Sequence, residues 1–164
     1  MAKKKDYGND SITMLKGADK VRKRPAVIFG SDGLDGCEHS VFEIISNSID
    51  EAREGYGKKI VITRFLDKSI EGQDFGRGIP VDYNKKENCY NWELVFCDLY
   101  AGGKYNTNEG GSYEFSLGLN GLGLCATQYA SEYMEAEIHT GGYCYELSFK
   151  NGEIDGDMKK TPYD

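Results

Sequence analysis

The sequence feature that most constrains the fold is one long amphipathic helix, predicted after the turn-rich stretch GSDGLDG. Within CEHSVFEIISNSIDEAREG, apolar residues recur at helical spacing at Val41, Ile45, Ile49 and Ala52. Gly55 or Gly57 ends the element, as glycine commonly does after a helix. This is the best-defined helix of the chain, and another layer of structure must cover its apolar face.

The remaining patterns predict two hairpins and three further helices. KKIVITRFL and SIEGQDF are rich in β-branched and aromatic residues and flank a short turn at Asp67 and Lys68. MEAEIHTGGYCYELSFKNGEI alternates in the same way around Gly141 and Gly142. Helices are predicted in NWELVFCDLYAGG, in GLCATQYASEY and in SITMLKGADKVRKRP, the last ending at Pro25. We therefore expect an α+β fold with helices on one face of a mostly antiparallel sheet.

Length and composition indicate one folded domain. The chain has 164 residues, of which 39% are hydrophobic and 29% charged, so it is long enough for one core and too short for two. The formal net charge is -7, so the surface as a whole repels a phosphate backbone, and a DNA partner would be held by other parts of a larger protein. No apolar run approaches the roughly 20 residues that cross a bilayer, which predicts a cytoplasmic protein without a membrane partner.

Cysteine and histidine patterns disfavour several kinds of site. The five cysteines are odd in number and contain no C-x-x-C pair, so the sequence indicates neither a disulfide framework nor a zinc site. They are expected to be reduced thiols. The two histidines, His39 and His139, lie far apart in sequence, which disfavours a histidine metal site and a Ser/His/Asp triad.

The long helix carries a polar stripe opposite its apolar residues. Glu43, Asn47 and Asp50 follow one another at i, i+4 and i+7 and therefore share one face. Such a stripe is commonly a solvated helix face. Alternatively, the carboxylate could act as a general base toward water and the amide oxygen could bind a hard divalent ion.

Two glycine-containing segments are candidate ligand sites. In DFGRGIP, Asp74 is expected at a strand end and offers an acceptor to an amino group, although a plain turn would use the same residues. In LGLNGLGL, Gly118, Gly121 and Gly123 precede a helix start, where free N–H groups suit a phosphate. Neither a Walker A loop nor a dinucleotide G-x-G-x-x-G motif is present.

The order of these motifs resembles that of a known family. VFEIISNSIDEA, QDFGRGIP, AGGKY and GLNGLG follow one another as in the GHKL, or Bergerat-fold, ATPases. LKGADKVRKRPAVIFG and DMKKTPYD are similar to the type II DNA topoisomerase B subunits, gyrase or topoisomerase IV, rather than to the chaperone, histidine kinase or mismatch-repair branches. The resemblance implies a two-layer GHKL sandwich that binds and hydrolyses ATP with Mg²⁺.

The resemblance also implies a domain organisation. Residues 1–14 correspond to an N-terminal arm and 15–164 to the ATP-binding domain, with an ATP lid at about 102–121 that we expect to be mobile. Family members continue past KKTPYD with a Thr-Gly-Thr segment and a closing strand. The chain is therefore expected to be a shortened domain that binds ATP and turns it over weakly.

The resemblance implies roles for individual residues. Glu43 corresponds to the glutamate that polarises the attacking water, Asn47 to the magnesium ligand and Asp74 to the residue that binds the adenine amino group. Lys104 corresponds to a catalytic countercharge near the phosphates. The other nucleotide-binding positions are Asp50, Gly78, Ile79, Pro80, Tyr113, Gly118, Leu119, Asn120, Gly121, Leu122, Gly123 and Tyr7.

The resemblance implies partners, and two other functions stay open. Tyr7 lies in the arm that reaches a second B subunit, while the A subunit and DNA would join in the full-length enzyme, and ATP-competitive inhibitors would occupy the nucleotide site. Three departures from the family pattern are Asn120, Thr140 and a longer loop after Lys104. One alternative is a regulatory or degenerate GHKL domain without hydrolysis, which the retained Glu43 disfavours. A histidine kinase catalytic domain is disfavoured by VRKRP and AGGKY.

Overall fold

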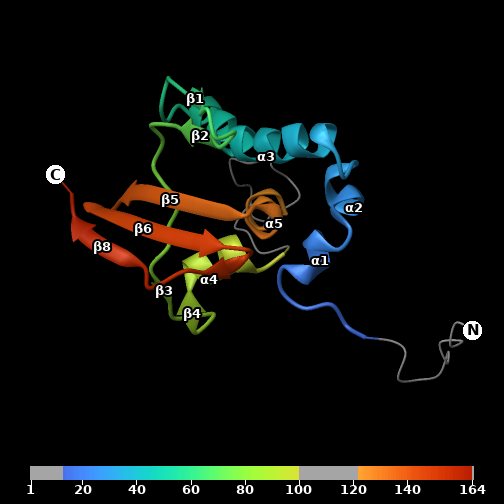
Figure 1. The fold of residues 1–164 in the computed structure, drawn as a ribbon. Helices are drawn as coiled ribbons and strands as arrows, with labels where there is room; N and C mark the ends of the chain where they lie inside the picture. Colours follow the sequence, from blue (N-terminus) through green and yellow to red (C-terminus); the bar gives the residue numbers. More distant parts are fainter. Residues whose placement is uncertain (1–12, 100–121, 164) are drawn as a thin grey trace, which may run out of the picture.

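A computed structural model describes residues 13–99 and 122–163 (Figure 1). The expected lid and residues 1–12 of the expected arm lie outside these residues, including Tyr7, Lys104, Tyr113 and 118–121. The helices are α1 (Asp19–Arg22), α2 (Pro25–Phe29), α3 (Leu34–Arg53), α4 (Asn91–Cys97) and α5 (Gly123–Ala130). The strands are β1 (Val61–Arg64), β2 (Ile70–Gln73), β3 (Tyr83–Asn84), β4 (Cys89–Tyr90), β5 (Tyr133–Thr140), β6 (Tyr143–Lys150), β7 (Glu153–Ile154) and β8 (Lys159–Pro162).

The predicted α+β class is confirmed, with one difference in the sheet. Every strand pairing in the described part of the chain is antiparallel, but the strands form three separate sheets instead of one. β1 pairs with β2, β3 pairs with β4, and β6 pairs with β5 on one side and with β7 and β8 on the other. Figure 1 shows the β1–β2 hairpin beside α3, apart from the β5–β6–β8 sheet.

Both predicted hairpins form with the predicted turns. Arg64 pairs with Ile70 across the first turn, and Thr140 pairs with Tyr143 across the second. β8 is an additional strand that the sequence patterns did not indicate. It lies in the KKTPYD stretch and pairs with the first half of β6.

The larger core cluster lies between α4 and the β5–β6 hairpin. Alternate residues of β6, Tyr145, Leu147 and Phe149, are buried on one face, as the alternation predicts. Phe96 of α4 stacks on Phe149 with ring centroids 5.2 Å apart. Burying one such side chain stabilises the fold by about 1.5–3 kcal/mol, so this contact holds α4 on the sheet.

The N-terminal helices form a second cluster with α5. Val21 of α1 and Phe29 of α2 are buried against Ala126 and Tyr129. The helix expected over SITMLKGADKVRKRP is only the four-residue α1, which ends at Arg22, and Pro25, expected to stop a helix, instead begins α2. Proline suits the first position of a helix because its missing N–H would have no intrahelical partner there.

α3 buries a different face from the one that its apolar pattern predicts. Gly36, Ser46 and Asp50 are its buried residues, whereas the expected apolar stripe is only half-buried. Ser46 satisfies its own hydroxyl by donating to the Glu43 carbonyl at 2.9 Å. α3 packs against α5, where the Thr127 hydroxyl donates to the Ser40 carbonyl at 3.2 Å, and against the β1–β2 hairpin, where Ile44 lies beside Gly72.

All five cysteines are free, as expected. Burial raises the pKa of the Cys125 thiol to about 12 and that of Cys97 to about 11, so both stay protonated at neutral pH. In the described residues, no helix is both long and apolar enough to span a membrane.

An ion pair connects β8 to the segment that follows DFGRGIP. Lys160 donates a hydrogen bond to Asp82, and Tyr145 donates to the same carboxylate oxygen at 3.2 Å. The bond from Lys160, together with the N–H of Tyr83, holds the pKa of Asp82 below its ordinary value. The same bond to Asp82 raises the pKa of Lys160.

This pair predicts a pH-dependent contribution to stability. The Asp82 contribution is present above its unfolded pKa and is lost as the pH falls through the lowered folded value. The Lys160 contribution is present below its unfolded pKa and is lost as the pH rises through the raised folded value. The ion pair therefore stabilises the fold between about pH 4 and pH 10. Lys160→Met should lower the urea midpoint at pH 7, and its effect should decrease progressively as the pH falls below about 4. Lys86→Met, in the exposed turn between β3 and β4, is the control, and an effect of Lys160→Met that does not decrease below about pH 4 would contradict the assignment.

Candidate functional site

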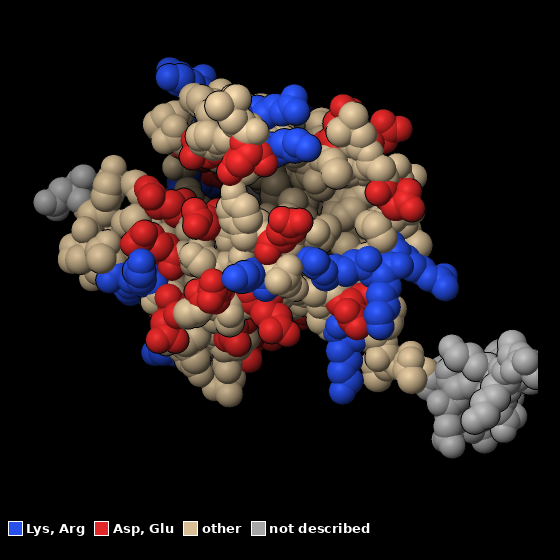
Figure 2. Space-filling view, viewed as in Figure 1, with Lys and Arg blue, Asp and Glu red and all other residues tan. Residues whose placement is uncertain are grey.

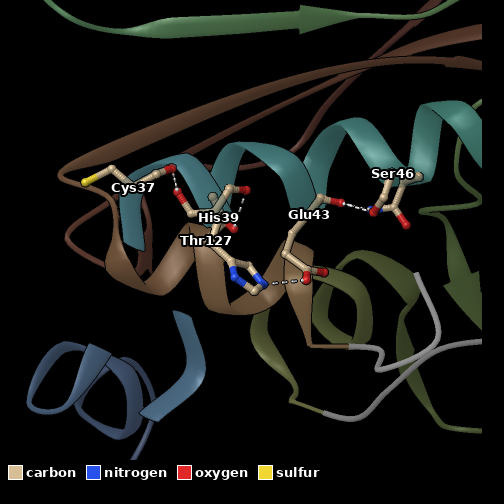
Figure 3. A network of polar contacts seen from close by, with 7 residues as sticks. Cys37, His39, Glu43, Ser46 and Thr127 are labelled. Atoms are coloured by element: carbon tan, nitrogen blue, oxygen red, sulfur yellow. Dashed lines mark hydrogen bonds and ion pairs between the residues drawn. The ribbon is translucent and has the colours of Figure 1, made fainter. Parts of the chain in front are cut away.

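Glu43 lies on α3 with its carboxylate paired to a histidine one turn earlier. His39 Nε2 and Glu43 Oε1 are 3.1 Å apart, and Figure 3 shows both side chains on the side of α3 that faces α5. The Glu43 side chain is 20% exposed, so it is largely enclosed while still reachable by solvent. Phe29 contacts the other side of the His39 ring in an edge-to-face arrangement. The carboxylate is thus held in one orientation at the helix surface.

The second oxygen of Glu43 lies beside the start of α5. Gly123 is buried there, and a Cβ at this position would lie 2.8 Å from the Cβ of Glu43 and would overlap Oε2. Only glycine therefore allows α5 to begin at this carboxylate. A pocket opens at the same place, lined by Ile28, Phe29, His39, Glu43, Leu122 and Gly123.

Asn47 and Asp50 continue the polar stripe along α3. Asn47 Nδ2 donates to the Glu43 carbonyl at 3.2 Å, which turns the amide oxygen away from its own helix. Asp50 is only 5% exposed. The stripe is therefore not a solvated helix face, because two of its members are half-buried and the third is buried. Its carboxylate and amide oxygens are the donor types that Mg²⁺ prefers.

Asp74 follows β2 and receives a hydrogen bond on each carboxylate oxygen. Ser48 of α3 donates its hydroxyl to Oδ2 at 2.6 Å, and the N–H of Gly76 donates to Oδ1 at 2.9 Å. Asp74 remains exposed. A carboxylate has about four acceptor positions, so two such bonds orient the group and leave capacity for a donor from a ligand.

An ion pair beside Asp74 fixes the following loop to α3. Arg77 donates from Nη2 to Glu51 Oε1 at 2.7 Å and from Nε to Oε2 at 3.0 Å, a two-pronged pairing. The guanidinium also lies 3.8 Å from the centre of the Tyr56 ring. The loop after β2 is therefore attached to α3 at both Ser48 and Glu51.

Of the three residues after Arg77, Gly78 and Ile79 have identifiable roles in the fold. Gly78 has a φ of +74°, and a Cβ there would overlap the carbonyl oxygen of His139 in β5. Glycine is thus required by the chain's own backbone at this point. Ile79 packs against the larger core cluster, and Pro80 is exposed. These three remain predicted pocket residues.

The structure brings Glu43, Asn47, Asp50 and Asp74 together along α3, whereas Gly78 lies against β5 and Ile79 against the larger core cluster. Ser48, which holds Asp74, follows Glu43 by five residues, a separation of about 7.5 Å along the α3 axis. Leu122 and Gly123 close the Glu43 end. The candidates outside the described residues are Tyr7, Lys104, Tyr113, Gly118, Leu119, Asn120 and Gly121.

The sequence patterns missed four residues of this arrangement. His39 was detectable in principle, since it stands four residues before Glu43 on the same helix. The Ser48 bond to Asp74 and the Arg77 bond to Glu51 each span 26 residues of sequence. No local pattern indicates a pairing at that separation.

Known proteins similar to this chain support the resemblance of its motifs. The chain is 43% identical over 152 residues to the B subunit of DNA topoisomerase 4 from Staphylococcus aureus, in strains MW2, Mu50 and N315. The match covers 93% of this chain and 22% of each relative, so the chain spans about a fifth of their length. No protein-family model matches it. Identity of this extent over nearly the whole chain shows that it is similar throughout to one segment of a DNA topoisomerase 4 B subunit, consistent with a fragment of such a subunit.

Proposed function

We propose that this chain is the GHKL-type ATP-binding domain of a type II topoisomerase B subunit. The observation that supports the proposal is that one helix, α3, carries Glu43 and also orients Asp74 through Ser48. At one end Glu43 faces the start of α5, and at the other Ser48 orients Asp74. One rigid helix would thus position both the group that binds the base of a nucleotide and the group that acts at its phosphates.

At the phosphate end, Glu43 is the general base. Its carboxylate accepts a proton from the water that attacks the terminal phosphate, and His39 keeps it aimed at that water. Mg²⁺, when bound, neutralises charge on the phosphates, and Asn47 is the residue that would hold it. Free N–H groups at the start of α5 and in the preceding lid would bind the phosphate oxygens.

At the base end, Asp74 accepts a hydrogen bond from the adenine amino group. Its orientation is already set by Ser48 and Gly76, so little conformational entropy is lost on binding. Asp50, Gly78, Ile79 and Pro80 belong to the proposed lining of this pocket. ATP-competitive inhibitors would use the same acceptor.

The rest of the proposed cycle involves parts beyond the described residues. In the proposal, the lid at about 102–121 and Lys104 enclose the phosphates, and Tyr7 in the arm reaches the site of a second B subunit. ATP-driven dimerisation would then gate DNA passage together with the A subunit. Figure 2 shows acidic and basic side chains interspersed on the visible face, and the chain as a whole carries a net charge of -7. DNA would therefore contact other parts of the enzyme.

Magnesium-dependent binding tests this proposal on the chain itself. Calorimetry with a non-hydrolysable ATP analogue is expected to show binding in Mg²⁺ that Asn47→Ala weakens by about tenfold, or 1.4 kcal/mol. The loss should be much smaller in EDTA. Ser46→Ala is the matched control, because Ser46 bonds the same Glu43 carbonyl without being a proposed metal ligand. If the parent chain, folded by circular dichroism, binds no analogue, the proposal is wrong.

A further inference from the structure

A second cluster of potential ligand groups lies on the β5–β6 hairpin. Glu137, His139 and Cys144 offer one carboxylate oxygen, one imidazole nitrogen and one thiol sulfur, all within 4.8 Å of one another. His139 and Cys144 are direct partners across the two strands, and Glu137 precedes His139 by two positions. All three therefore point to the same face of the sheet, opposite the core residues Ile138 and Tyr145.

The separations suit a small divalent ion. His139 Nε2 and Glu137 Oε1 are already 2.8 Å apart. A tetrahedral zinc ion, with bonds of about 2.0–2.3 Å, holds its ligand atoms roughly 3.4–3.6 Å apart. Small side-chain rotations therefore bring the three atoms to coordinating distance while the strand register stays unchanged.

Nearby groups favour a cation at this place. Glu146 lies opposite Glu137 in the strand register, which adds a second carboxylate to the face. Burial and the charges of Glu137 and Glu146 raise the pKa of the Cys144 thiol, whereas a hydrogen bond with the Thr161 side chain lowers it. A divalent ion at this place would offset the charge of the two carboxylates and release the thiol proton on binding.

Residues of β8 and Tyr163, which follows it, hold the cluster in place. The Tyr163 ring lies over His139 with ring centroids 3.9 Å apart, and Thr161 pairs with Cys144 across the strands. The His139 side chain is 37% exposed, which leaves a route for an ion from solvent. The site is thus partly covered, partly open and built on paired strands.

We propose that Glu137, His139 and Cys144 bind a thiophilic divalent cation of the zinc class. One sulfur, one nitrogen and one oxygen ligand match the types that zinc accepts, with water completing the coordination. C-x-x-C and histidine spacing did not indicate this site, because two of its ligands come from one strand and the third from its partner. The site shares no side chain with the proposed ATP function, although the His139 backbone lies beside Gly78 of the proposed adenine pocket.

Cobalt titration tests the proposal on the reduced 164-residue chain. Co²⁺ is expected to bind with one ion per chain and to produce a thiolate-to-cobalt charge-transfer band, which Zn²⁺ then abolishes by displacement. Cys144→Ser should remove the band, whereas Cys89→Ser, at a half-buried thiol on β4, should retain it. His139→Gln and Glu137→Gln should each weaken Zn²⁺ binding at least about tenfold. Glu135→Gln, at the preceding position on the same face of β5, should leave it unchanged.

Three outcomes would overturn the metal site. The first is the absence of a charge-transfer band in the folded parent chain. The second is a band that survives Cys144→Ser. The third is a band that Cys144→Ser removes while His139→Gln and Glu137→Gln leave the affinity for the metal ion unchanged. That result would identify a lone reactive thiol.

Discussion

Asp74→Ala is expected to bind ATP analogues and ATP-competitive inhibitors at least about tenfold more weakly than the parent chain. The loss arises because the ligand amino group gives up its hydrogen bonds to water and gains none in the site, which costs about 1–3 kcal/mol. Asp74 is held in position by Ser48 and Gly76, so the carboxylate does not have to be ordered when the ligand arrives. Calorimetric titration of both proteins measures the difference directly.

Asp67 provides a matched control for this experiment. Its carboxylate accepts bonds from the Ser69 hydroxyl at 2.7 Å and from the Ser69 N–H at 2.9 Å, as Asp74 does from Ser48 and Gly76. Asp67→Ala should therefore remove a turn-forming aspartate without changing nucleotide affinity. Ser48→Ala should weaken binding less than Asp74→Ala, since it removes only the orienting bond. Unchanged affinity in a folded Asp74→Ala chain would show that DFGRGIP is only a turn.

Glu43→Ala, placed in the full-length B subunit with its partner subunit, is expected to lower ATP turnover by about 10²–10⁴-fold. ATP-driven supercoiling or decatenation should be lost with it. Analogue binding and analogue-induced dimerisation should persist, because the adenine and phosphate contacts do not depend on the base. Steady-state ATPase rates and analogue affinity, measured on the same preparations, separate the two effects.

Three further variants show whether Glu43 acts as a base. Glu43→Gln keeps the size of the side chain and should be as inactive as Glu43→Ala. His39→Ala should reduce turnover less, since it removes only the group that orients the carboxylate. Glu38→Ala, at an exposed position on the same helix, should have no effect. A Glu43→Ala enzyme that hydrolyses ATP at the parent rate would eliminate the proposed mechanism, whatever the fold.

Much of the fold was predictable because its signals are local. The alternation in YCYELSFK predicts β6 and its buried face, and the glycine pair at 141 and 142 predicts the turn before it. α4 begins at Asn91 as predicted, where Glu93 accepts the N–H of Tyr90, but it ends at Cys97 because Asp98 is extended. β8 gave no such signal, since the polar stretch KKTP is a strand only through its pairing with β6.

The sequence by itself determined the α+β class, both hairpins and a polar stripe on α3 that carries Glu43 and Asn47, because helical and strand periodicities are set by neighbours a few residues apart. Only the tertiary structure decided that this stripe faces inward, that Gly123 lies against Glu43 and that Ser48 and Glu51 hold the loop after β2. It also brought Cys144 beside His139. Each of these depends on packing between elements distant in sequence, where close approach and shared hydrogen bonds, rather than local propensity, set the arrangement.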